Sequence, residues 1–498
     1  MKSWSFALVS SLALWSVCRA TAAAAETFQP VRESLVRYGV PAWYQDAKFG
    51  VYMHWAPFSV PAYKTEWYPR WMYVPEHPIQ RYHIKTWGPL DKFGYKDFIP
   101  LFRAEKFDPD AFARLIKESG ARYMAAAGVH HDGFAMWDSK AIPYNAKAMG
   151  PRRDVTGELI AAARRLGLKA GVATHYGRHW RYYTFRPEYD NWNPKYEGLY
   201  GRRRGDNDPP RPEDAAHWKA VLLELIDNYQ PDYIYVDGGV TDALRMYKVP
   251  YFRDAMYQVV AYYYTQSRAW GKGVVITHKR GAMRPDEAVE DFERRGLNEI
   301  RADKWQTDDK FSLDGWCYVK DTRFWPTRLF VQALTDVVSK NGNLLLSIGP
   351  KPDGTIREEE ARALRQIGAW LRVNDEAIYG TRPWRVYGEG GRTRFHFPGD
   401  RRTKWEMGPD AVRFTRKGDT LYAFVFHWPK SGRFLIRSIS SARPISRSGI
   451  ARVSMVGSEE PIRWKLSERG LEVSFPSRKP CDYAFAFRIE PKGKLLTE

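Results

Sequence analysis

The sequence predicts an α/β protein in which a closed β/α (TIM-like) barrel precedes a smaller all-β sandwich. Short apolar strands alternate with amphipathic helices from Ala47 to Gly349, which is typical of a parallel sheet. Polar side chains stand just after several of these strands, as at the mouth of a barrel. After Trp384 the segments alternate in character and are punctuated by Gly, Pro and Ser, which favours antiparallel sheets.

The chain is long enough for a large barrel and a second module: it has 498 residues, of which 44% are hydrophobic and 27% charged. This composition excludes a disordered chain and a membrane bundle. Aromatic residues make up 15%. Such a content fits either binding of sugar-ring faces or enlarged cores, and composition does not decide between them.

Residues 1–25 are expected to form a cleaved signal peptide. Lys2 precedes an apolar run from Phe6 to Cys18, and the small residues Ala22–Ala25 offer a cleavage site. The alternative is an uncleaved anchor. No later run is long enough to span a bilayer, so we expect no membrane insertion and a secreted or periplasmic mature protein.

The expected barrel domain covers residues 26–380. Its predicted strands are Phe49–Trp55, Arg122–Val129, Leu168–Thr174, Asp232–Val236, Gly273–Thr277 and Asn343–Ile348. Its predicted helices are Asp110–Ser119, Glu158–Leu166, Pro212–Tyr229, Arg253–Ala269 and Thr327–Ser339. About eight strands would close a barrel. An open doubly wound sheet is the alternative, but no glycine-rich phosphate loop follows the first strand.

The expected second domain, residues 381–498, is basic. It holds 24 Lys and Arg against 12 Asp and Glu, so it carries +12 of the chain's +20. An exported basic protein would favour acidic polysaccharides over nucleic acid, although charged strand faces that serve only solubility explain the excess equally well. Besides Cys18, the chain has Cys317 and Cys481, and the sequence does not say whether they pair.

Asp237 is the first candidate for chemistry. It ends an apolar strand and is followed by two glycines, and a buried carboxylate is costly without a partner. A turn-capping role is the alternative. Glu293 follows another strand and is the candidate second carboxylate, with Asp291 and Glu299 as competitors. A retaining glycosidase needs two such groups about 5–5.5 Å apart.

Five histidines stand at predicted strand ends, and a carboxylate–indole pair follows the first strand. Adjacent residues of a strand point to opposite faces, so His130 and His131 are poorly placed for one metal ion, and hydrogen bonds to sugar hydroxyls suit them better. Glu66 beside Trp67 fits a carboxylate that takes hydroxyls and a ring that covers a C–H face. The histidines are His54, His130, His131, His175 and His278.

An ordered set of motifs from Ala42 to Trp384 resembles the retaining α-L-fucosidases of glycoside hydrolase family 29. The motifs include Lys48–Trp55, Glu66–Tyr68, His130–Phe134, Trp137–Ser139, Pro231–Gly238, Trp305–Thr307 and Asn343–Pro350. The resemblance implies a barrel with a C-terminal β-sandwich, release of terminal α-L-fucose from a fucosylated oligosaccharide or polysaccharide, and no metal or other cofactor.

By this resemblance Asp237 is the nucleophile and Glu293 the acid/base. The expected substrate-binding residues are those that match the family's sugar contacts or stand at the same predicted mouth: His54, Glu66, Trp67, His130, His131, His175, Tyr176, Lys279 and Trp316.

The chain departs from the family pattern in several places. Tyr235 stands where many members have Trp, and Trp316-Cys317-Tyr318 replaces the usual Trp-Gly-Tyr. These departures concern the contacts around the sugar more than the chemistry. Two alternatives to a fucosidase stay open: a non-catalytic carbohydrate-binding protein and an α-L-galactosidase. The natural glycan, its linkage and the oligomeric state do not follow from the sequence.

Overall fold

The computed structural model describes Met1 and residues 26–237, 250–279 and 282–497. The rest of the expected signal peptide and the glycines after Asp237 lie outside the described residues. Within the described residues no helix is both long and apolar enough to cross a membrane.

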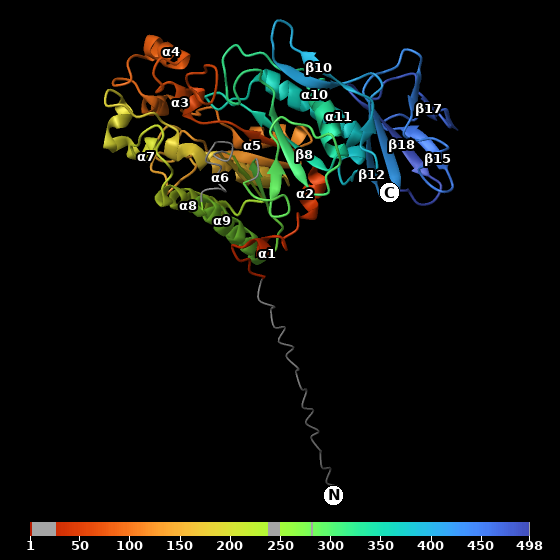
Figure 1. Cartoon of the computed structure of the whole chain (residues 1–498), viewed down its shortest axis with the longest axis horizontal. Coiled ribbons are helices and arrows are strands. Elements are labelled where there is room, and N and C mark those ends of the chain that lie inside the picture. Colours follow the sequence, from red (N-terminus) through yellow and green to blue (C-terminus); the bar gives the residue numbers. More distant parts are fainter. Residues whose placement is uncertain (2–25, 238–249, 280–281, 498) are drawn as a thin grey trace.

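Eight parallel strands pair in chain order and close on themselves, which confirms the predicted barrel (Figure 1). The first and last strands complete the closure, with Phe49 opposite Leu344 and Met53 opposite Ile348. The strands are β1 (Phe49–Met53), β2 (Tyr123–Val129), β3 (Lys169–Thr174), β4 (Tyr233–Val236), β5 (Val275–Lys279), β6 (Val289–Asp291), β7 (Trp305–Lys310) and β8 (Gly342–Ile348).

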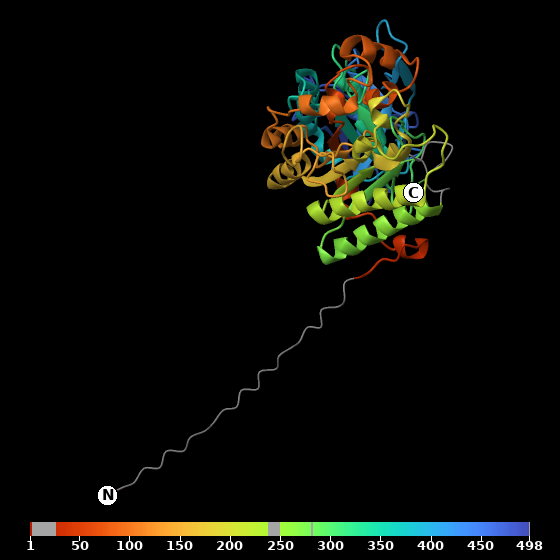
Figure 2. The same cartoon turned by 90° about the vertical axis from the view of Figure 1, so that its left-hand side faces the viewer.

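Helices cover the outside of the barrel, and α8 and α9 pack side by side along one flank (Figures 1 and 2). The α-helices are α1 (Arg32–Leu35), α2 (Ala42–Ala47), α3 (Tyr68–Trp71), α4 (Pro78–Trp87), α5 (Pro109–Glu118), α6 (Val155–Arg165), α7 (Glu197–Tyr200), α8 (Pro212–Tyr229), α9 (Pro250–Ala269), α10 (Thr327–Ser339) and α11 (Glu358–Ile378). Short 3₁₀ helices are η1 (Pro57–Ser59), η2 (Tyr95–Leu101), η3 (Tyr176–Arg181), η4 (Asp190–Trp192) and η5 (Pro194–Tyr196).

Local sequence signals explain where these elements begin and end. The carboxylate of Asp108 accepts a hydrogen bond from the backbone N–H of Ala111 at 2.9 Å and caps α5, while Pro109 occupies the first helical position. Gly120, with φ of 84°, follows the end of that helix. Every residue of β2 is buried, as expected for a strand covered by helices outside and side chains inside.

The barrel interior is rich in tyrosine. The hydroxyl groups of Tyr44, Tyr123 and Tyr233 all donate to Oε1 of Gln306, at 2.8, 3.1 and 2.9 Å. Because a buried hydroxyl needs a partner, this one amide satisfies three rings that would otherwise carry unpaired polar groups. The polar residue of β7 is therefore part of the barrel core.

The C-terminal part forms antiparallel sheets, as predicted. A five-stranded sheet has the order β15-β18-β13-β12-β9, and a three-stranded sheet has the order β14-β17-β16. The strands are β9 (Gly388–Glu389), β10 (Arg392–His396), β11 (Thr403–Met407), β12 (Val412–Lys417), β13 (Thr420–Val425), β14 (Arg433–Ile436), β15 (Ile450–Met455), β16 (Trp464–Ser467), β17 (Gly470–Ser474) and β18 (Phe485–Pro491).

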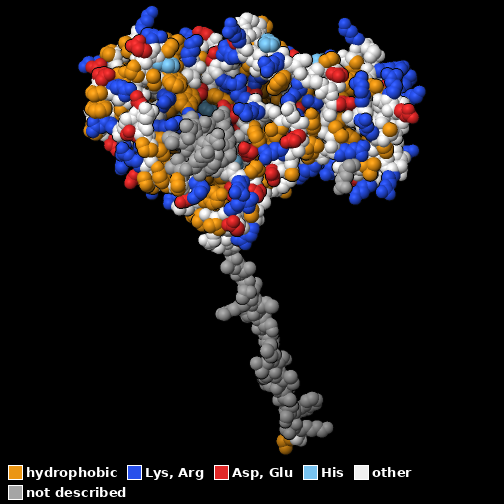
Figure 3. Space-filling model, viewed as in Figure 1, with side chains coloured by type: hydrophobic (Ala, Val, Ile, Leu, Met, Phe, Trp, Pro, Cys, Tyr) orange, Lys and Arg blue, Asp and Glu red, His pale blue; other side chains and the backbone are white. Residues whose placement is uncertain are grey.

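The predicted domain boundary, near Tyr379 to Trp384, falls between the end of α11 and the start of β9. The boundary stays a prediction. Lys and Arg side chains gather on the face of the C-terminal sheets seen in Figure 3. Exposed basic residues of this part include Arg452, Arg463, Lys465, Arg469, Arg478 and Lys479.

The hairpin β10–β11 leaves the C-terminal sheets and packs on the barrel. The ammonium of Lys404 in β11 pairs with the carboxylate of Asp309 in β7. The ring of Phe395 in β10 lies 6.3 Å from that of Trp325, just before α10. The C-terminal part thus touches the barrel strand that carries Asp308 and Asp309.

A buried ion pair also joins the two parts. The guanidinium of Arg413 in β12 contacts the carboxylate of Asp336 in α10 at 2.5 Å, and Lys340 contacts the same carboxylate at 2.6 Å. The side chains of Arg413 and Asp336 are 2% and 5% exposed. These cations hold the pKa of Asp336 below its usual value although burial opposes them.

Removing Arg413 should therefore destabilise the protein. We expect Arg413→Ala to lower the free energy of unfolding by about 3 kcal/mol, since the buried Asp336 carboxylate loses one of its three cationic partners and keeps Lys340 and Arg392. The urea midpoint measures the change. Arg433→Ala is the matched control, because its pair with Glu472 is 71% and 48% exposed and should contribute below about 1 kcal/mol. Equal midpoints for the two variants would contradict the assignment.

Candidate active site

A cavity of about 260 Å³ opens at the carboxyl ends of the barrel strands. This is the end at which barrel enzymes carry their active sites. Its lining residues are His54, Glu66, Trp67, His130, His131, His175, Arg178, Asp237, Lys279, Glu293, Asp308 and Trp316. Side chains from seven strands or their following loops thus converge on one hollow.

The ammonium of Lys279, the last residue of β5, lies at the base of this cavity. Its Nζ is 3.3 Å from Oδ2 of Asp237 and 3.2 Å from Oε2 of Glu293. The side chain of Lys279 is 2% exposed, against 23% and 27% for the two acids. The lysine therefore lies beneath the two carboxylates, and they face the cavity.

Burial by itself would lower the pKa of Lys279, but the charges of Asp237, Asp308 and Glu293 outweigh it and raise that pKa well above its ordinary value. The ammonium is thus charged at neutral pH. Burial, followed by the charge of the nearby Asp291, raises the pKa of Asp308 well above its usual range, although Lys279 opposes this shift.

The shared lysine limits how far apart the two cavity-facing carboxylates are. Both oxygens contact one nitrogen atom, so they lie no more than about 6.5 Å from each other. Retaining glycosidases separate their carboxyl groups by about 5–5.5 Å, and inverting ones by about 6.5–9.5 Å. The arrangement can therefore support nucleophilic attack by one carboxylate with proton transfer by the other.

Glu293 stands in a strained turn that starts two residues after β6. Glu293 and Arg294 have φ of 35° and 57°, a left-handed conformation that costs non-glycine residues roughly 1–2 kcal/mol each. The turn is held by a hydrogen bond from the backbone N–H of Glu293 to the Asp291 carboxylate at 2.9 Å, and by one from Arg294 to the Asp308 carbonyl at 2.8 Å.

The same contacts separate Glu293 from its competitors. Asp291 is 1% exposed, accepts from the Glu293 backbone and from Gln306, and does not line the cavity. Glu299 is exposed and also lies away from the lining. Geometry therefore favours Glu293 as the second carboxylate, and Asp291 supports its turn.

Four of the five predicted histidines form one wall of the cavity. The rings of His54 and His175 have centroids 4.5 Å apart, and those of His130 and His175 4.8 Å. Burial, followed by mutual repulsion and nearby cations, lowers the pKa of each of the four well below 6.5. Neutral imidazoles can both donate and accept hydrogen bonds. The fifth, His278, does not line the cavity.

Glu66 and Trp316 form a part of the lining that adjoins the histidines. The carboxylate of Glu66 accepts a hydrogen bond from the backbone N–H of Trp316 at 2.8 Å, so two loops far apart in sequence are tied together. The Trp316 ring lies 5.3 Å from that of His54. The guanidinium of Arg178 lies 5.2 Å over the ring of Trp67.

One predicted residue lies elsewhere. Tyr176 is directed to a neighbouring cavity, where its hydroxyl group hydrogen-bonds to Nε2 of His217 at 3.0 Å.

Two residues that line the active-site cavity, Arg178 and Asp308, are not among the residues predicted from the sequence. The polar alternation of Trp305–Lys310 is a signal that could have found Asp308, whereas Arg178 stands among several arginines with nothing to single it out.

His54, His130 and His175 have ligand atoms within 4.8 Å of one another, a loose spacing for a metal ion. Tetrahedral zinc holds its nitrogen ligands about 2.0–2.1 Å away, which needs a tighter cluster. Nδ1 of His54 also bonds to Ser347 at 2.9 Å, and the charge of Lys279 acts on His54 and His175. The surroundings suit a neutral polyol better than a cation.

A closed barrel with two carboxylates that face one sugar-sized hollow defines the class of barrel glycoside hydrolases. Residues 16–376 match the family model for α-L-fucosidase, and residues 407–490 match the one for the α-L-fucosidase C-terminal domain. The chain therefore belongs to the α-L-fucosidase family.

Named relatives are similar to this protein over almost the whole chain. Tissue α-L-fucosidase of Homo sapiens is 30% identical and covers 93% of this chain and 91% of its own length. An α-L-fucosidase of Branchiostoma floridae is 29% identical, covering 93% and 96%. The crystal structure of Thermotoga maritima α-fucosidase in complex with fucose superposes with a TM-score of 0.74 at 28% identity, covering 93% and 99%.

The buried neutral histidines predict how stability depends on pH. Their pKa is lower in the folded protein than in the unfolded chain, so below about pH 6.5 the unfolded chain binds protons that the folded protein does not. Each such imidazole can lower the free energy of unfolding by up to about 1.4 kcal/mol per pH unit. We expect the urea midpoint to fall less between about pH 7.5 and 5.5 in His175→Asn than in the wild type.

Burial raises the pKa values of Asp132 and Asp308, so these two groups make the folded protein more stable as the pH falls. The test is therefore the difference in pH dependence between the variant and the wild type. His396→Asn, at an exposed position of β10, should keep the wild-type dependence. Identical dependence in wild type and His175→Asn would refute the neutral state of the cluster.

Proposed function

We propose that this protein is a secreted, exo-acting and retaining α-L-fucosidase that releases terminal α-L-fucose through a fucosyl-enzyme intermediate. The observation that carries the proposal is the pair of cavity-facing carboxylates, Asp237 and Glu293, held on one buried ammonium in a chain of the α-L-fucosidase family. Product analysis by ¹H NMR tests it, since retention delivers α-L-fucose first.

Asp237 is the proposed nucleophile. Its carboxylate attacks the anomeric carbon, and the bond to the leaving oxygen breaks as the fucosyl ester forms. Lys279 contacts this carboxylate at 3.3 Å, and the hydrogen bond from the Asp237 backbone N–H to the Thr174 carbonyl at 2.8 Å holds the residue at the end of β4. His175, whose Nε2 is 3.6 Å from the carboxylate, borders it on one side.

Glu293 is the proposed acid/base. As a carboxylic acid it protonates the departing oxygen, and as a carboxylate it then takes a proton from the water that cleaves the ester. The strained turn at Glu293 fits this role, because proteins retain backbone strain mainly at functional sites, where it positions a side chain. The proposed chemistry uses only side chains and water.

The remaining walls are proposed to hold the sugar. The neutral histidines His54, His130, His131 and His175 can donate to and accept from hydroxyl groups, and Glu66 can accept from two of them. Trp67 and Trp316 offer faces for C–H groups. Tyr235, the departure from the family's Trp, hydrogen-bonds to Asp308 at 2.9 Å and therefore acts on the base of the cavity instead of on the sugar.

The expected signal peptide supports secretion, and the basic C-terminal sheets support a polymeric substrate that carries acidic groups. Both remain proposals. Cys317 and Cys481 are both free thiols in this fold.

A fluorinated fucosyl donor should trap Asp237. We expect a 2-fluoro-fucosyl fluoride to inactivate the enzyme and mass spectrometry to place the added mass on the peptide that holds Asp237, since the fluorine slows ester hydrolysis. Asp237→Ala should lose at least about 10⁴-fold in kcat. Asp138→Asn, at an exposed position, is the control. Labelling of another carboxylate would reject the nucleophile.

Glu293→Ala should be rescued by azide. On an aryl fucoside with an activated leaving group we expect its turnover to fall by about 10²–10⁴-fold and to recover with azide, which needs no base to attack the ester. The product should be fucosyl azide. Glu299→Ala, from the same segment, should keep wild-type turnover. Rescue of Glu299→Ala instead of Glu293→Ala would reverse the assignment.

A further inference from the structure

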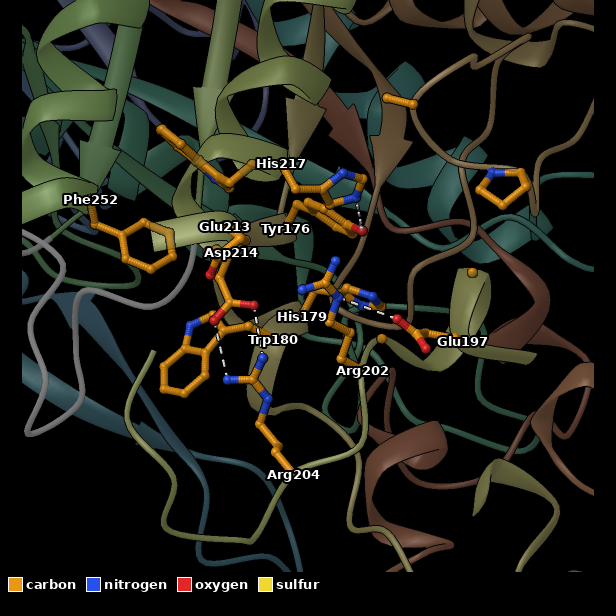
Figure 4. A pocket seen from close by; sticks show the side chains of 16 residues that line it. Tyr176, His179, Trp180, Glu197, Arg202, Arg204, Glu213, Asp214, His217 and Phe252 are labelled. Atoms are coloured by element: carbon orange, nitrogen blue, oxygen red, sulfur yellow. Dashed lines mark hydrogen bonds and ion pairs between the residues drawn. The ribbon is translucent and has the colours of Figure 1, made fainter. Parts of the chain in front are cut away.

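A second, larger cavity lies beside the candidate active-site cavity that Asp237 and Glu293 line, which is called the fucose cavity below after its proposed ligand. It has a volume of about 400 Å³, within the range of small-molecule sites. Figure 4 shows that charged and aromatic side chains converge on it, among them Tyr176, Trp180, His217 and Phe252. Within the described part of the chain, no side chain lines both cavities.

The 3₁₀ helix η3 forms the wall between the two cavities. With three residues per turn, side chains at i and i+3 lie above one another. His175 and Arg178 accordingly line the fucose cavity, whereas Tyr176 and His179 line the second one. The rings of Tyr176 and His179 stack with centroids 4.6 Å apart and an interplanar angle of 14°. This geometry explains why Tyr176, a predicted substrate-binding residue, does not line the active-site cavity.

The polar groups of this second cavity include hydrogen-bond donors and acceptors in fixed positions. Nδ1 of His179 is 3.0 Å from the carbonyl oxygen of His131. A carbonyl only accepts, so Nδ1 carries the proton and Nε2 is left as an acceptor. Burial lowers the pKa of His179 to about 4, which keeps the ring neutral. The Tyr176 hydroxyl and His217 form a second polar pair.

The charges in the lining are largely paired within it. Arg204 contacts Asp214 at 2.8 Å, and Arg202 contacts Glu197 at 3.3 Å (Figure 4). These two ion pairs cancel, and among the described lining residues Glu213 is left as a third carboxylate, so the lining disfavours an anionic ligand. The exposed carboxylate of Glu213 adds a further acceptor for a hydroxyl group.

Aromatic rings supply the apolar surface. Trp180, Phe252 and Trp218 line the cavity together with Tyr176. Flat rings beside fixed hydrogen-bonding groups match a pyranose, which has an apolar C–H face and a rim of hydroxyl groups.

We propose that this second cavity binds a neutral sugar residue, separately from the fucose cavity. The site would let the protein hold an unfucosylated unit of a glycan while η3 presents His175 and Arg178 to the reacting sugar. The inference does not depend on hydrolysis, because binding alone is at issue. Its failure would therefore leave the proposed fucosidase activity untouched.

Lactose, a neutral disaccharide without fucose, is the probe. Binding to the full-length protein is followed by saturation-transfer NMR and by tryptophan fluorescence, since Trp180 and Trp218 line the cavity. We expect a Kd in the millimolar range and a loss of about tenfold or more in Trp180→Ala and in Glu213→Gln. Glu66→Gln, in the fucose cavity, should keep lactose binding.

Trp464→Ala is the control for loss of a partly exposed indole, at 37% exposure in the C-terminal sheets. Glu213 is exposed, so Glu213→Gln tests the cavity even if Trp180→Ala fails to fold, which circular dichroism would reveal. Absence of lactose binding up to about 50 mM would overturn the proposal. If Glu66→Gln lost lactose binding while Glu213→Gln kept it, lactose would bind in the fucose cavity, and this result would also overturn the proposal.

Discussion

The buried ammonium of Lys279 is the interaction on which the candidate active site depends. Two carboxylates that face one small cavity repel each other when both are charged. A single cation beneath them offsets that repulsion and fixes both groups at contact distance from one nitrogen. The barrel makes this possible, because Lys279 ends one strand while Asp237 and Glu293 follow the strands on either side.

Much of the fold could be predicted from the sequence, because apolar periodicity and helix caps are local signals. The helices Pro212–Tyr229 and Thr327–Ser339 occur with the predicted bounds. The sequence predicts about eight strands, but its local patterns do not place β6 and β7. β7 reads Trp-Gln-Thr-Asp-Asp-Lys, and its buried Gln306 and Asp308 serve tyrosines from other strands. No local pattern shows such partners.

The same limit applies to the site. Residues at strand ends, such as His54 and Asp237, could be placed at one mouth, because the barrel brings all strand ends together. Their mutual distances, and the burial that keeps the histidines neutral, arise only from packing. Tyr176 shows the limit most plainly: it follows His175 directly, yet one step along a 3₁₀ helix turns its ring into a different cavity.

The hairpin β10–β11 has a consequence for how the molecule can be divided. Lys404 lies beyond the predicted domain boundary but neutralises Asp309, the neighbour of Asp308 on β7, and Arg294 approaches the same carboxylate at 3.7 Å. A chain that ended after α11 would keep every residue that lines the fucose cavity, but it would lack Lys404, which pairs with Asp309 next to Asp308. The hairpin β10–β11 thus supports β7 directly behind the strand residue that lines the cavity, so the part of the chain after α11 is joined to the barrel by more than a linker.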